Sequence, residues 1–425
     1  MASEWEVIKF GDCAQRISDI VQPHQMAERT PYIGLEHIVE GGLQLNGQAD
    51  ASEATSAKTR FRRGDVLFGK LRPYFRKVVR PKFDGICSTD IWAVRAKNGS
   101  DQGFLFYRMA SQEFIDKSMG ASTGTRMPRA DWGFLSQWEM PLPPLAEQKA
   151  IASILGALDD KIELNRRMNA TLEGMARALF QSWFVDFDPV RAKLDGRKPE
   201  GMDKATAALF PDAFQESEAG QIPKGWTEDT IKNRASNIQY GFTQSATKDP
   251  VGPHFLRITD ISQGRIDWDS VPFCQATDEE REKYRIKDGD IFIARTGAST
   301  GDNIYAVDPP PAVFASYLIR IQFSSPGLGR LVGEFTRTPG YASYVAGTIG
   351  GSAQPHASAQ TLAGASIVFP TEEIANVYYR TVRPLDLTRA ANDRESRTLA
   401  TLRDTLLPKL LSGELSVASI PKITE

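Results

Sequence analysis

The sequence is poor in the residues from which metal sites and thiol chemistry are built. It contains three cysteines and four histidines among 425 residues. Cys13, Cys87 and Cys274 lie far apart and form no Cys-x-x-Cys pair, which argues against a disulfide framework and a zinc ribbon. The histidines lack the spacing of metal ligands, and no serine or cysteine lies in a recognisable nucleophile elbow. We therefore expect no metal site and no catalytic residues, and the scarcity of cysteine fits a reducing cytoplasm.

Long apolar runs and an excess of one charge are also missing. No stretch of about 18 apolar residues occurs, and the N-terminus has neither a basic leader nor an apolar core. We therefore expect a protein that neither spans a membrane nor is exported. A hydrophobic content of 41% with 24% charged residues is ordinary for a globular protein and argues against a disordered chain. The net charge of -2 lacks the basic excess that is common in nucleic-acid-binding domains.

Charge is nevertheless distributed unevenly along the chain. Between Arg60 and Lys82, nine basic residues stand against the single acid Asp65, and aromatic residues including Phe68, Tyr74 and Phe75 are interleaved with them. This composition favours a surface that binds phosphate groups, although a solvated charged face is the alternative.

Two signatures of enzymes are present in incomplete form. The stretch Asp308–Pro311 reads Asp-Pro-Pro-Pro, which lacks the aromatic residue of the Asp-Pro-Pro-Tyr loop of adenine methyltransferases. Gly-Ala-Ser-Thr-Gly occurs at 120–124 and at 297–301, but neither copy is followed by the Lys-Ser/Thr of a P-loop. We therefore expect neither a stand-alone methyltransferase nor a nucleotide hydrolase.

The most informative positive feature is an internal repeat. Phe61–Phe68 recurs as Tyr284–Phe292, and Tyr32–Ile38 matches Phe255–Ile261 at nearly the same offset. A period near half the chain length indicates two copies of one domain, because solenoid repeats are roughly 20 to 50 residues long. We expect two α/β (α+β) modules, at 1–143 and 221–370. Each should contain short strands, a helix (104–117 and 328–345) and a Gly-rich loop (120–126 and 347–353).

Each module is followed by a segment with the apolar period of a coiled coil. The spacing predicts long helices at 144–185 and 371–415. We expect a linker at 186–220, with a short helix near 205–209, and a tail at 416–425. If the two helices pair through matching seams, chain order makes them antiparallel. The predicted seam comprises Ile151, Leu155, Leu158, Ile162, Asn165, Leu172 and Leu179 in the first helix, and Leu385, Asn392, Leu399, Leu406 and Leu410 in the second. Asn165 and Asn392 occupy equivalent positions, where they either fix the register as buried amides or face solvent.

Four stretches of this sequence resemble the specificity subunit of Type I restriction-modification systems. They are Pro143–Ile151, Phe180–Pro189, Gly220–Trp226 and Leu407–Leu415, and the similarity extends over essentially the whole chain. One departure is the start of the second helix, Thr371–Asn376, which lacks the Pro-Pro-Leu-x-Glu-Gln pattern that opens the first.

This resemblance implies a non-catalytic DNA-recognition subunit that binds double-stranded DNA at a split site, one half-site per target-recognition domain. It further implies that the helices separate the two domains and dock two modification subunits, which carry S-adenosylmethionine. Restriction subunits, with their ATP and Mg²⁺, would join through this M2S1 complex, and no cofactor is expected on this chain. The alternative from another class is a coiled-coil scaffold for partner proteins, with incidental DNA binding.

Residues expected to contact DNA are basic or polar side chains in and after the repeated loops. The candidates in the first module are Lys70, Arg72, Tyr74, Arg76 and Lys77, followed by Arg126 and Arg129 after the Gly-rich loop. Those in the second are Arg295, Thr296, Ser299, Thr300 and Asn303, with Gln354 and His356 after the second Gly-rich loop. The second loop is less basic, so we expect the two modules to prefer different sequences.

Overall fold

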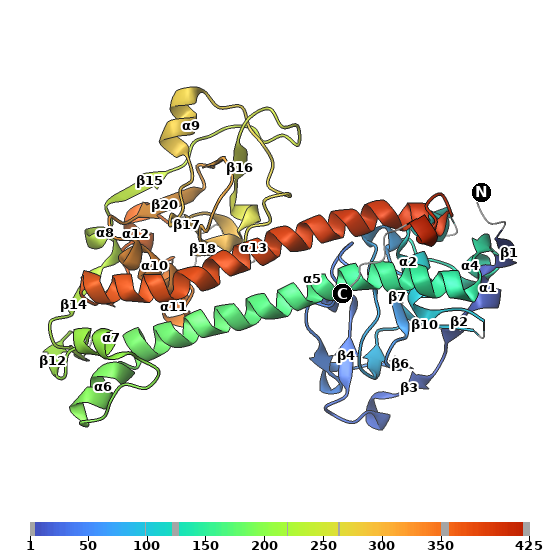
Figure 1. Cartoon of the computed structure of the whole chain (residues 1–425), viewed down its shortest axis with the longest axis horizontal. Helices are drawn as coiled ribbons and strands as arrows, with labels where there is room; N and C mark the ends of the chain where they lie inside the picture. The colour runs from blue at the N-terminus through green and yellow to red at the C-terminus, as the bar shows by residue number, and fades with distance from the viewer. Residues whose placement is uncertain are drawn as a thin grey trace. The chain divides into compact units, whose positions relative to one another are not determined.

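The computed structural model describes residues 5–97, 99–120, 127–218, 220–261, 264–349 and 357–419. The chain divides into two units (Figure 1). The first comprises residues 1–164 together with 395–425, and the second comprises residues 165–394. Within the described ranges, no helix combines the length and the apolar character that a membrane crossing requires.

The first unit is built on an antiparallel sheet of four strands in the order β2-β10-β7-β8. These strands are Ala14–Ile17, Ile91–Ala96, Val66–Gly69 and Val78–Val79 respectively. A second sheet has the order β3-β6-β9-β4-β5, formed by Ile20–Val21, Lys58–Phe61, Gly85–Cys87, Pro31–Ile33 and Ala49–Asp50. A separate antiparallel pair joins β1 (Glu6–Lys9) to β11 (Glu139–Leu142). The helices of this module are α1 (Phe10–Cys13), α2 (Gln102–Ala110), α3 (Gln112–Gly120) and α4 (Trp132–Ser136).

The second unit contains the same four-stranded arrangement, in the order β15-β20-β17-β18. Its strands are Asn237–Tyr240, Leu318–Gln322, Ile291–Ala294 and Asn303–Tyr305. The parallel pair β4–β9 also has a counterpart, β16 (His254–Leu256) with β19 (Ala312–Phe314), and β14 (Thr227–Thr230) pairs with β21 (Ser366–Phe369). The accompanying helices are α8 (Ile231–Arg234), α9 (Asp278–Tyr284), α10 (Pro326–Phe335), α11 (Pro339–Ile349) and α12 (Ala359–Leu362). The predicted duplication of one mixed α/β module is thus confirmed in strand order.

The single helix predicted in each module is wrong, because both modules contain two helices at that place. Ser111 separates α2 from α3, and its hydroxyl donates to the carbonyl of Arg108 while accepting from the N–H of Phe114. Thr338 makes the same two bonds in the second module, to the carbonyl of Phe335 and from the N–H of Tyr341. A hydroxyl that donates to a carbonyl at the end of one helix and accepts from an N–H at the start of the next favours a break between them. Pro339 at the start of α11 reinforces the break in the second module.

One long helix follows each module in the chain, as predicted. Helix α5 spans Leu145–Phe180, is about 54 Å long at 1.5 Å per residue, and ends in a π-helical turn at Gln181–Val185. Helix α13 spans Glu372–Leu411 and is about 60 Å long.

Contacts within each unit show that these helices are antiparallel. In the first unit Lys161 pairs with Glu395, and Asp159 pairs with Arg403. Residues nearer the N-terminus of α5 therefore contact residues nearer the C-terminus of α13. The second unit repeats this order, because Asn165 contacts Asn392 while the hydroxyl of Tyr378 donates to the carbonyl of Ala176.

The two seam asparagines are buried in the interface between the helices. Asn165 is fully buried and donates to the carbonyl of Asn392 at 3.4 Å. The side chain of Asn392 donates to the Oδ1 of Asn169 at 2.9 Å. Of the two alternatives for these amides, the structure selects the buried one.

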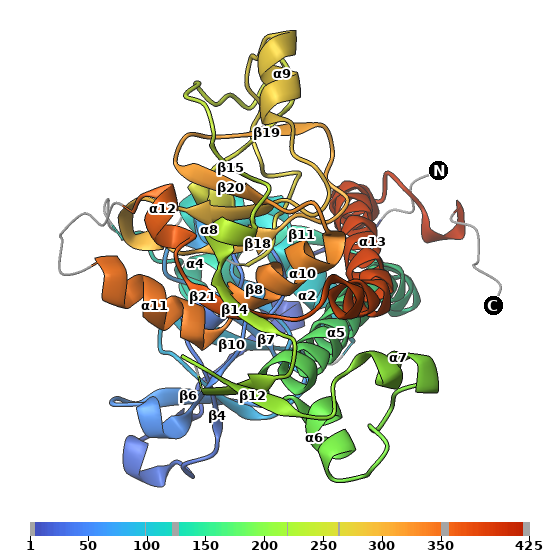
Figure 2. The same ribbon diagram turned by 90° about the vertical axis from the view of Figure 1, so that its left-hand side faces the viewer.

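The segment 186–220, expected as a linker with one short helix near 205–209, is folded within the second unit and contains that helix. It contains α6 (Asp188–Leu194), α7 (Lys204–Leu209) and β12 (Phe214–Ser217), and β12 pairs with β13 (Gly220–Pro223). Helices α6 and α7 lie beside the C-terminal end of α5 (Figures 1 and 2). Phe210 is buried with its ring 5.2 Å from that of Trp183, which explains why this segment packs despite its charge and glycine content.

Candidate nucleic-acid interface

The candidate residues between Lys70 and Lys77 of the first module lie in the loop that connects β7 to β8. Backbone bonds hold this loop against two other segments. The N–H of Lys70 donates to the carbonyl of Asp90 at 2.9 Å, and the carbonyl of Lys70 accepts from the N–H of Ala130 at 2.9 Å. The N–H of Arg72 donates to the carbonyl of Pro128 at 2.8 Å. The loop and the segment that follows the Gly-rich stretch therefore form one surface.

The second module repeats this arrangement in the loop between β17 and β18. The N–H of Arg295 donates to the carbonyl of Tyr317 at 3.0 Å, and the carbonyl of Arg295 accepts from the N–H of Ala357 at 2.9 Å. Lys70 and Arg295 thus occupy the same backbone position in the two modules. Each module presents a cation there.

Three cations of the first loop have no acidic neighbour. In the part of the chain that the structure describes, Lys70, Arg72 and Arg76 form no ion pair; the guanidinium of Arg76 donates to the carbonyl of Ala110 at 3.3 Å. Arg72 and Arg76 are both in the left-handed region, with φ of 52° and 50°, which non-glycine residues rarely adopt. Such strain is concentrated at functional sites, where the surrounding structure maintains it. The loop therefore carries positive charge that forms no ion pair among the described residues, and such charge is suited to neutralising phosphate groups.

The other candidates of the first module differ in their availability. Lys77 donates its Nζ to the carbonyl of Leu35 at 2.7 Å, and the Nε of Arg129 lies 3.3 Å from the carboxylate of Asp90. Tyr74 is 47% exposed, with its ring 4.6 Å from that of Phe75, so an aromatic face is open at the loop tip. Arg126 lies outside the described residues.

The second loop uses its polar groups mainly to hold its own shape. The hydroxyl of Thr300 donates to the carbonyl of Gly297 at 2.7 Å, and that of Ser299 lies 3.4 Å from the carbonyl of Thr296. Arg295 donates its Nε to the carbonyl of Ser316 and lies over the ring of Tyr240. Gln354 and His356 lie outside the described residues.

Both polar atoms of the Asn303 side-chain amide form hydrogen bonds within the module. Its Nδ2 donates to the carbonyls of Gly301 and Thr336 at 3.1 and 2.7 Å, and its Oδ1 accepts from the hydroxyl of Thr336 at 3.1 Å. This residue ties the loop to the end of α10, so it positions the surface rather than presenting a free group.

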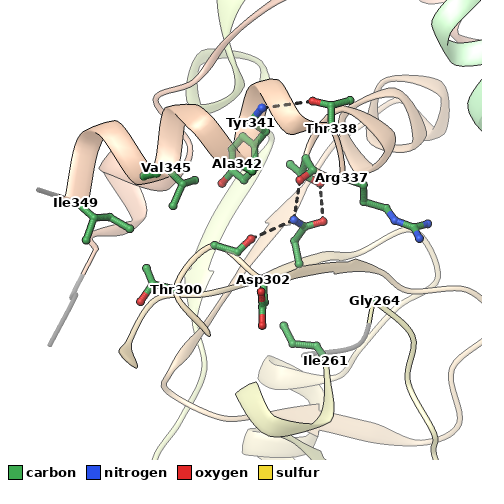
Figure 3. Close-up of a pocket in the computed structure, with 14 residues that line it drawn as sticks. Ile261, Gly264, Thr300, Asp302, Arg337, Thr338, Tyr341, Ala342, Val345 and Ile349 are labelled. Carbon is green, nitrogen blue, oxygen red and sulfur yellow. Dashed lines mark hydrogen bonds between the residues drawn. The ribbon is translucent and has the colours of Figure 1, made fainter. Parts of the chain in front are cut away.

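A cavity of about 360 Å³ opens between this loop and α11 (Figure 3). Its apolar wall includes Tyr341, Ala342, Val345 and Ile349, which line one side of α11. Asp302 lies between α11 and Ile261. Burial raises the pKa of its carboxyl above the usual value. The carboxylate accepts no hydrogen bond and forms no ion pair within the described ranges, so it is a charged acceptor without a partner.

Comparisons with known proteins agree with this duplicated architecture. Residues 2–174 match the model of the Type I restriction modification DNA specificity domain. The Type I restriction enzyme HindI specificity subunit of Haemophilus influenzae is 23% identical, over 97% of this chain and 100% of that protein. The MjaIX specificity subunit of Methanocaldococcus jannaschii is 24% identical, over 76% of this chain and 71% of that protein. The crystal structure of the Type I restriction-modification S subunit from M. genitalium has a TM-score of 0.55 at 14% identity and covers 99% of this chain and 97% of that one.

Residues 2–174 thus match a Type I restriction modification DNA specificity domain, and the chain as a whole is similar to Type I specificity subunits. Specificity subunits are the non-catalytic components of these systems, and partner subunits carry out catalysis. In this chain, burial raises the pKa of Cys13 and Cys274 to about 11 and that of Cys87 to about 12. Such thiols are not nucleophiles at neutral pH. Among the described residues, no group of three or more His, Cys, Asp or Glu side chains could hold a metal ion.

The predicted seam residues of this chain are all buried or partly buried. Those that are fully buried are Ile151, Leu155, Ile162, Asn165, Asn392 and Leu410. Those that are partly buried are Leu158, Leu172, Leu179, Leu385, Leu399 and Leu406. The exposed apolar side chains of these helices, such as Met175 and Leu402, fall between seam positions.

Two aspartates next to this seam attach the modules to the helices, and sequence reasoning missed both. Asp159 on α5 accepts from the hydroxyl of Tyr107 on α2 at 2.6 Å. Asp386 on α13, 227 positions later, accepts from Arg330 on α10 at 2.7 and 3.3 Å. Each follows a seam leucine, Leu158 or Leu385. An acid repeated at the same register of both helices was the signal in the sequence that could have found them.

Proposed function

We propose that this specificity subunit binds a DNA site in two parts, with each module recognising one half-site. The observation that carries the proposal is the duplicated loop, held by the same backbone bonds at Lys70 and Arg295 but lined with different side chains. A common framework with different loop chemistry is what two distinct half-sites would require. Binding would be strongest to double-stranded DNA, whose major groove distinguishes all four base pairs.

Affinity and sequence choice are expected to come from different residues. Lys70, Arg72 and Arg76 would contact phosphates of the first half-site, because they are unpaired cations on one loop. Phosphate contacts orient a protein on DNA without selecting a sequence, and base edges are read by fewer side chains. Arg129, Arg295, Thr296, Ser299 and Thr300 are our candidates for that reading, together with Arg126, Gln354 and His356.

The two long helices are proposed to separate the modules and to receive the partner subunits. Two modification subunits would bind one specificity subunit and bring S-adenosylmethionine. Restriction subunits would join this complex with ATP and Mg²⁺. The likeness to specificity subunits along the whole chain supports this assignment, as does the pairing of α5 with α13 within each unit. Such a complex would act on DNA in the cytoplasm.

Selection from random duplexes tests the proposal directly. The full chain, with its modification subunits, is incubated with a random duplex library, and bound DNA is sequenced over several rounds. We expect enrichment of a motif with two short conserved parts and an unconserved spacer of constant length. A protein-interaction scaffold predicts that no two-part motif is enriched, and that result would replace our proposal.

The spacing role of the helices has a separate test. Seven residues are inserted after Leu164 in α5 and seven after Arg394 in α13, so that the heptad phase of the seam is preserved. Each helix should lengthen by about 10.5 Å, close to three base pairs at about 3.4 Å each. The selected spacer should lengthen accordingly. An unchanged spacer in a folded variant would show that the helices do not set it.

A further inference from the structure

The two modules carry opposite charges at one equivalent position next to the proposed reading loops. Leu67 pairs with Val79 in the first module, and Phe292 pairs with Ile304 at the same register in the second. The residue before the outer strand also has the same role, because the carbonyl of Lys77 accepts from Gly69 N–H and that of Asp302 accepts from Ala294 N–H, both at 2.8 Å. Lys77 and Asp302 are therefore counterparts.

The side chain of Asp302, unlike its backbone, forms no hydrogen bond or ion pair with any residue that the structure describes. Its neighbour Asn303 satisfies its own amide through Gly301 and Thr336, and the hydroxyl of Thr300 bonds within the loop. The side chain of Asp302 lines the cavity and points toward Ile261, and its carboxylate has no cation or donor in the part of the chain that the structure describes (Figure 3). Partial burial of an unpaired charge opposes folding, and the raised pKa of this carboxyl is consistent with that penalty. A group of this kind is explained if its partner is a ligand.

The chemistry of DNA restricts what that partner can be. A carboxylate is repelled by phosphates, so it is tolerated at a DNA surface when it meets a hydrogen-bond donor on a base edge. In the major groove those donors are the amino groups of cytosine and adenine. Adenine presents its N7 acceptor beside the N6 amino group, whereas cytosine presents N4 alone. The apolar wall formed by Ala342 and Val345 offers no hydrogen bond of its own and suits the non-polar C5 edge of cytosine.

We infer that Asp302 determines one base of the second half-site by accepting a hydrogen bond from the N4 amino group of a cytosine. This inference rests on the proposed function and deepens it, because it assigns a base class to one side chain. It also accounts for the charge reversal relative to Lys77, since a cation at that position could not accept this bond.

Base selection by three variants tests the inference. Each is assayed in the full chain with its modification subunits, by the same selection from random duplexes. Asp302→Ala should lose the preference for a C·G pair at one position of one half-site, by about 5- to 150-fold in relative binding. Asp302→Asn should shift the preference at that position toward adenine, because an amide can bond both N6 and N7. Glu282→Gln is the matched control, since it removes one negative charge from an exposed position on α9 of the same module, and it should leave the motif unchanged.

The outcomes of the selection distinguish failure of the Asp302 assignment from failure of the proposed function. If the unmodified protein enriches no two-part motif, the proposed function itself fails. If it enriches such a motif and Asp302→Ala selects the same bases with the same preference, the assignment of Asp302 is overturned while the proposed function stands. Folding is checked by the unfolding midpoint of each variant, and we expect Asp302→Ala to be at least as stable as the unmodified protein.

Discussion

Replacing Asp386 with alanine should be among the most destabilising single changes in the second unit. Its carboxylate accepts two hydrogen bonds from Arg330, at 2.7 and 3.3 Å, and both side chains are 3% exposed. Glu334 also bonds Arg330, at 2.8 Å, and is 3% exposed. Removing Asp386 therefore leaves a buried guanidinium with one of its two carboxylates.

The expected magnitude follows from this burial. Breaking a buried ion pair by removing one partner costs about 3–5 kcal/mol, because a charge is left without compensation in a poorly solvated site. Arg330→Met should be at least as damaging, because it leaves two buried carboxylates near each other with Arg389, at 3.8 Å from Asp386, as the remaining cation. Asp308→Ala is the matched control. Asp308 and its partner Arg394 are 53% and 50% exposed, and exposed pairs contribute about 0–1 kcal/mol.

Denaturant unfolding measures these differences, and hydrogen exchange locates them. Peptides from α10, which carries Arg330, should lose protection in Asp386→Ala, whereas peptides from α2 in the other module should not. If Asp386→Ala unfolds within about 1 kcal/mol of Asp308→Ala, the reasoning about this buried anchor is refuted. Loss of protection spread equally over both units would equally contradict a local role.

Three further changes probe the loop and the helix contacts. Arg72→Ala should weaken binding to all duplexes alike and lower the slope of log K against log salt by about 0.9, as measured by titration at several salt concentrations; an altered motif instead would mean that Arg72 reads a base. Asn303→Ala should cost about 1–3 kcal/mol in denaturant unfolding, because it leaves the buried carbonyl of Thr336 without its donor, and a change below about 0.5 kcal/mol would contradict that role. Burial opposes ionisation of Glu173, but the guanidinium groups of Arg337 and Arg389 outweigh it and hold its pKa below the usual 4.5. Its contribution to stability is therefore present above pH 4.5 and is lost as the pH falls through the lowered pKa, and Glu173→Gln should remove this part of the acid sensitivity in unfolding measured from pH 7 to pH 3.

The parts of the fold that the sequence predicts are those with a regular period. Two long helices follow from apolar residues at alternating steps of three and four, and the duplicated sheet follows from the matching strands around Val66 and Ile291. The break between α2 and α3 was missed because the hydroxyl of Ser111 caps a helix without disturbing the apolar pattern around it. The short helix before Phe210 was predicted and is present as α7, but the packing of the rest of its segment was missed, because its apolar side chains are too few and irregular to give a period.

The candidate site was predicted less completely than the fold. Composition identified the basic loop at Lys70 and Arg72, because a cluster of one charge is visible in the chain itself. It could not show that Lys77 and Asn303 use their polar groups within the protein, since those partners are distant in sequence. Nor could composition single out Asp302. What distinguishes this acid is that its carboxylate has no hydrogen-bond or ion-pair partner among the described residues, and this is visible in the structure alone.

Comparison of the two copies within one chain separates residues that hold the modules from residues that we propose to read DNA. Asp159 and Asp386 have the same identity, the same register and the same task of attaching a module to a long helix. Lys77 and Asp302, by contrast, occupy the same backbone position at the end of the loop in the two modules but carry opposite charges. A framework residue is constrained by the fold, which both copies share, whereas a reading residue is constrained by the ligand, which differs between half-sites. The same comparison can therefore be applied along the repeat, and positions with equal backbone geometry but unequal charge are where we expect base recognition to lie.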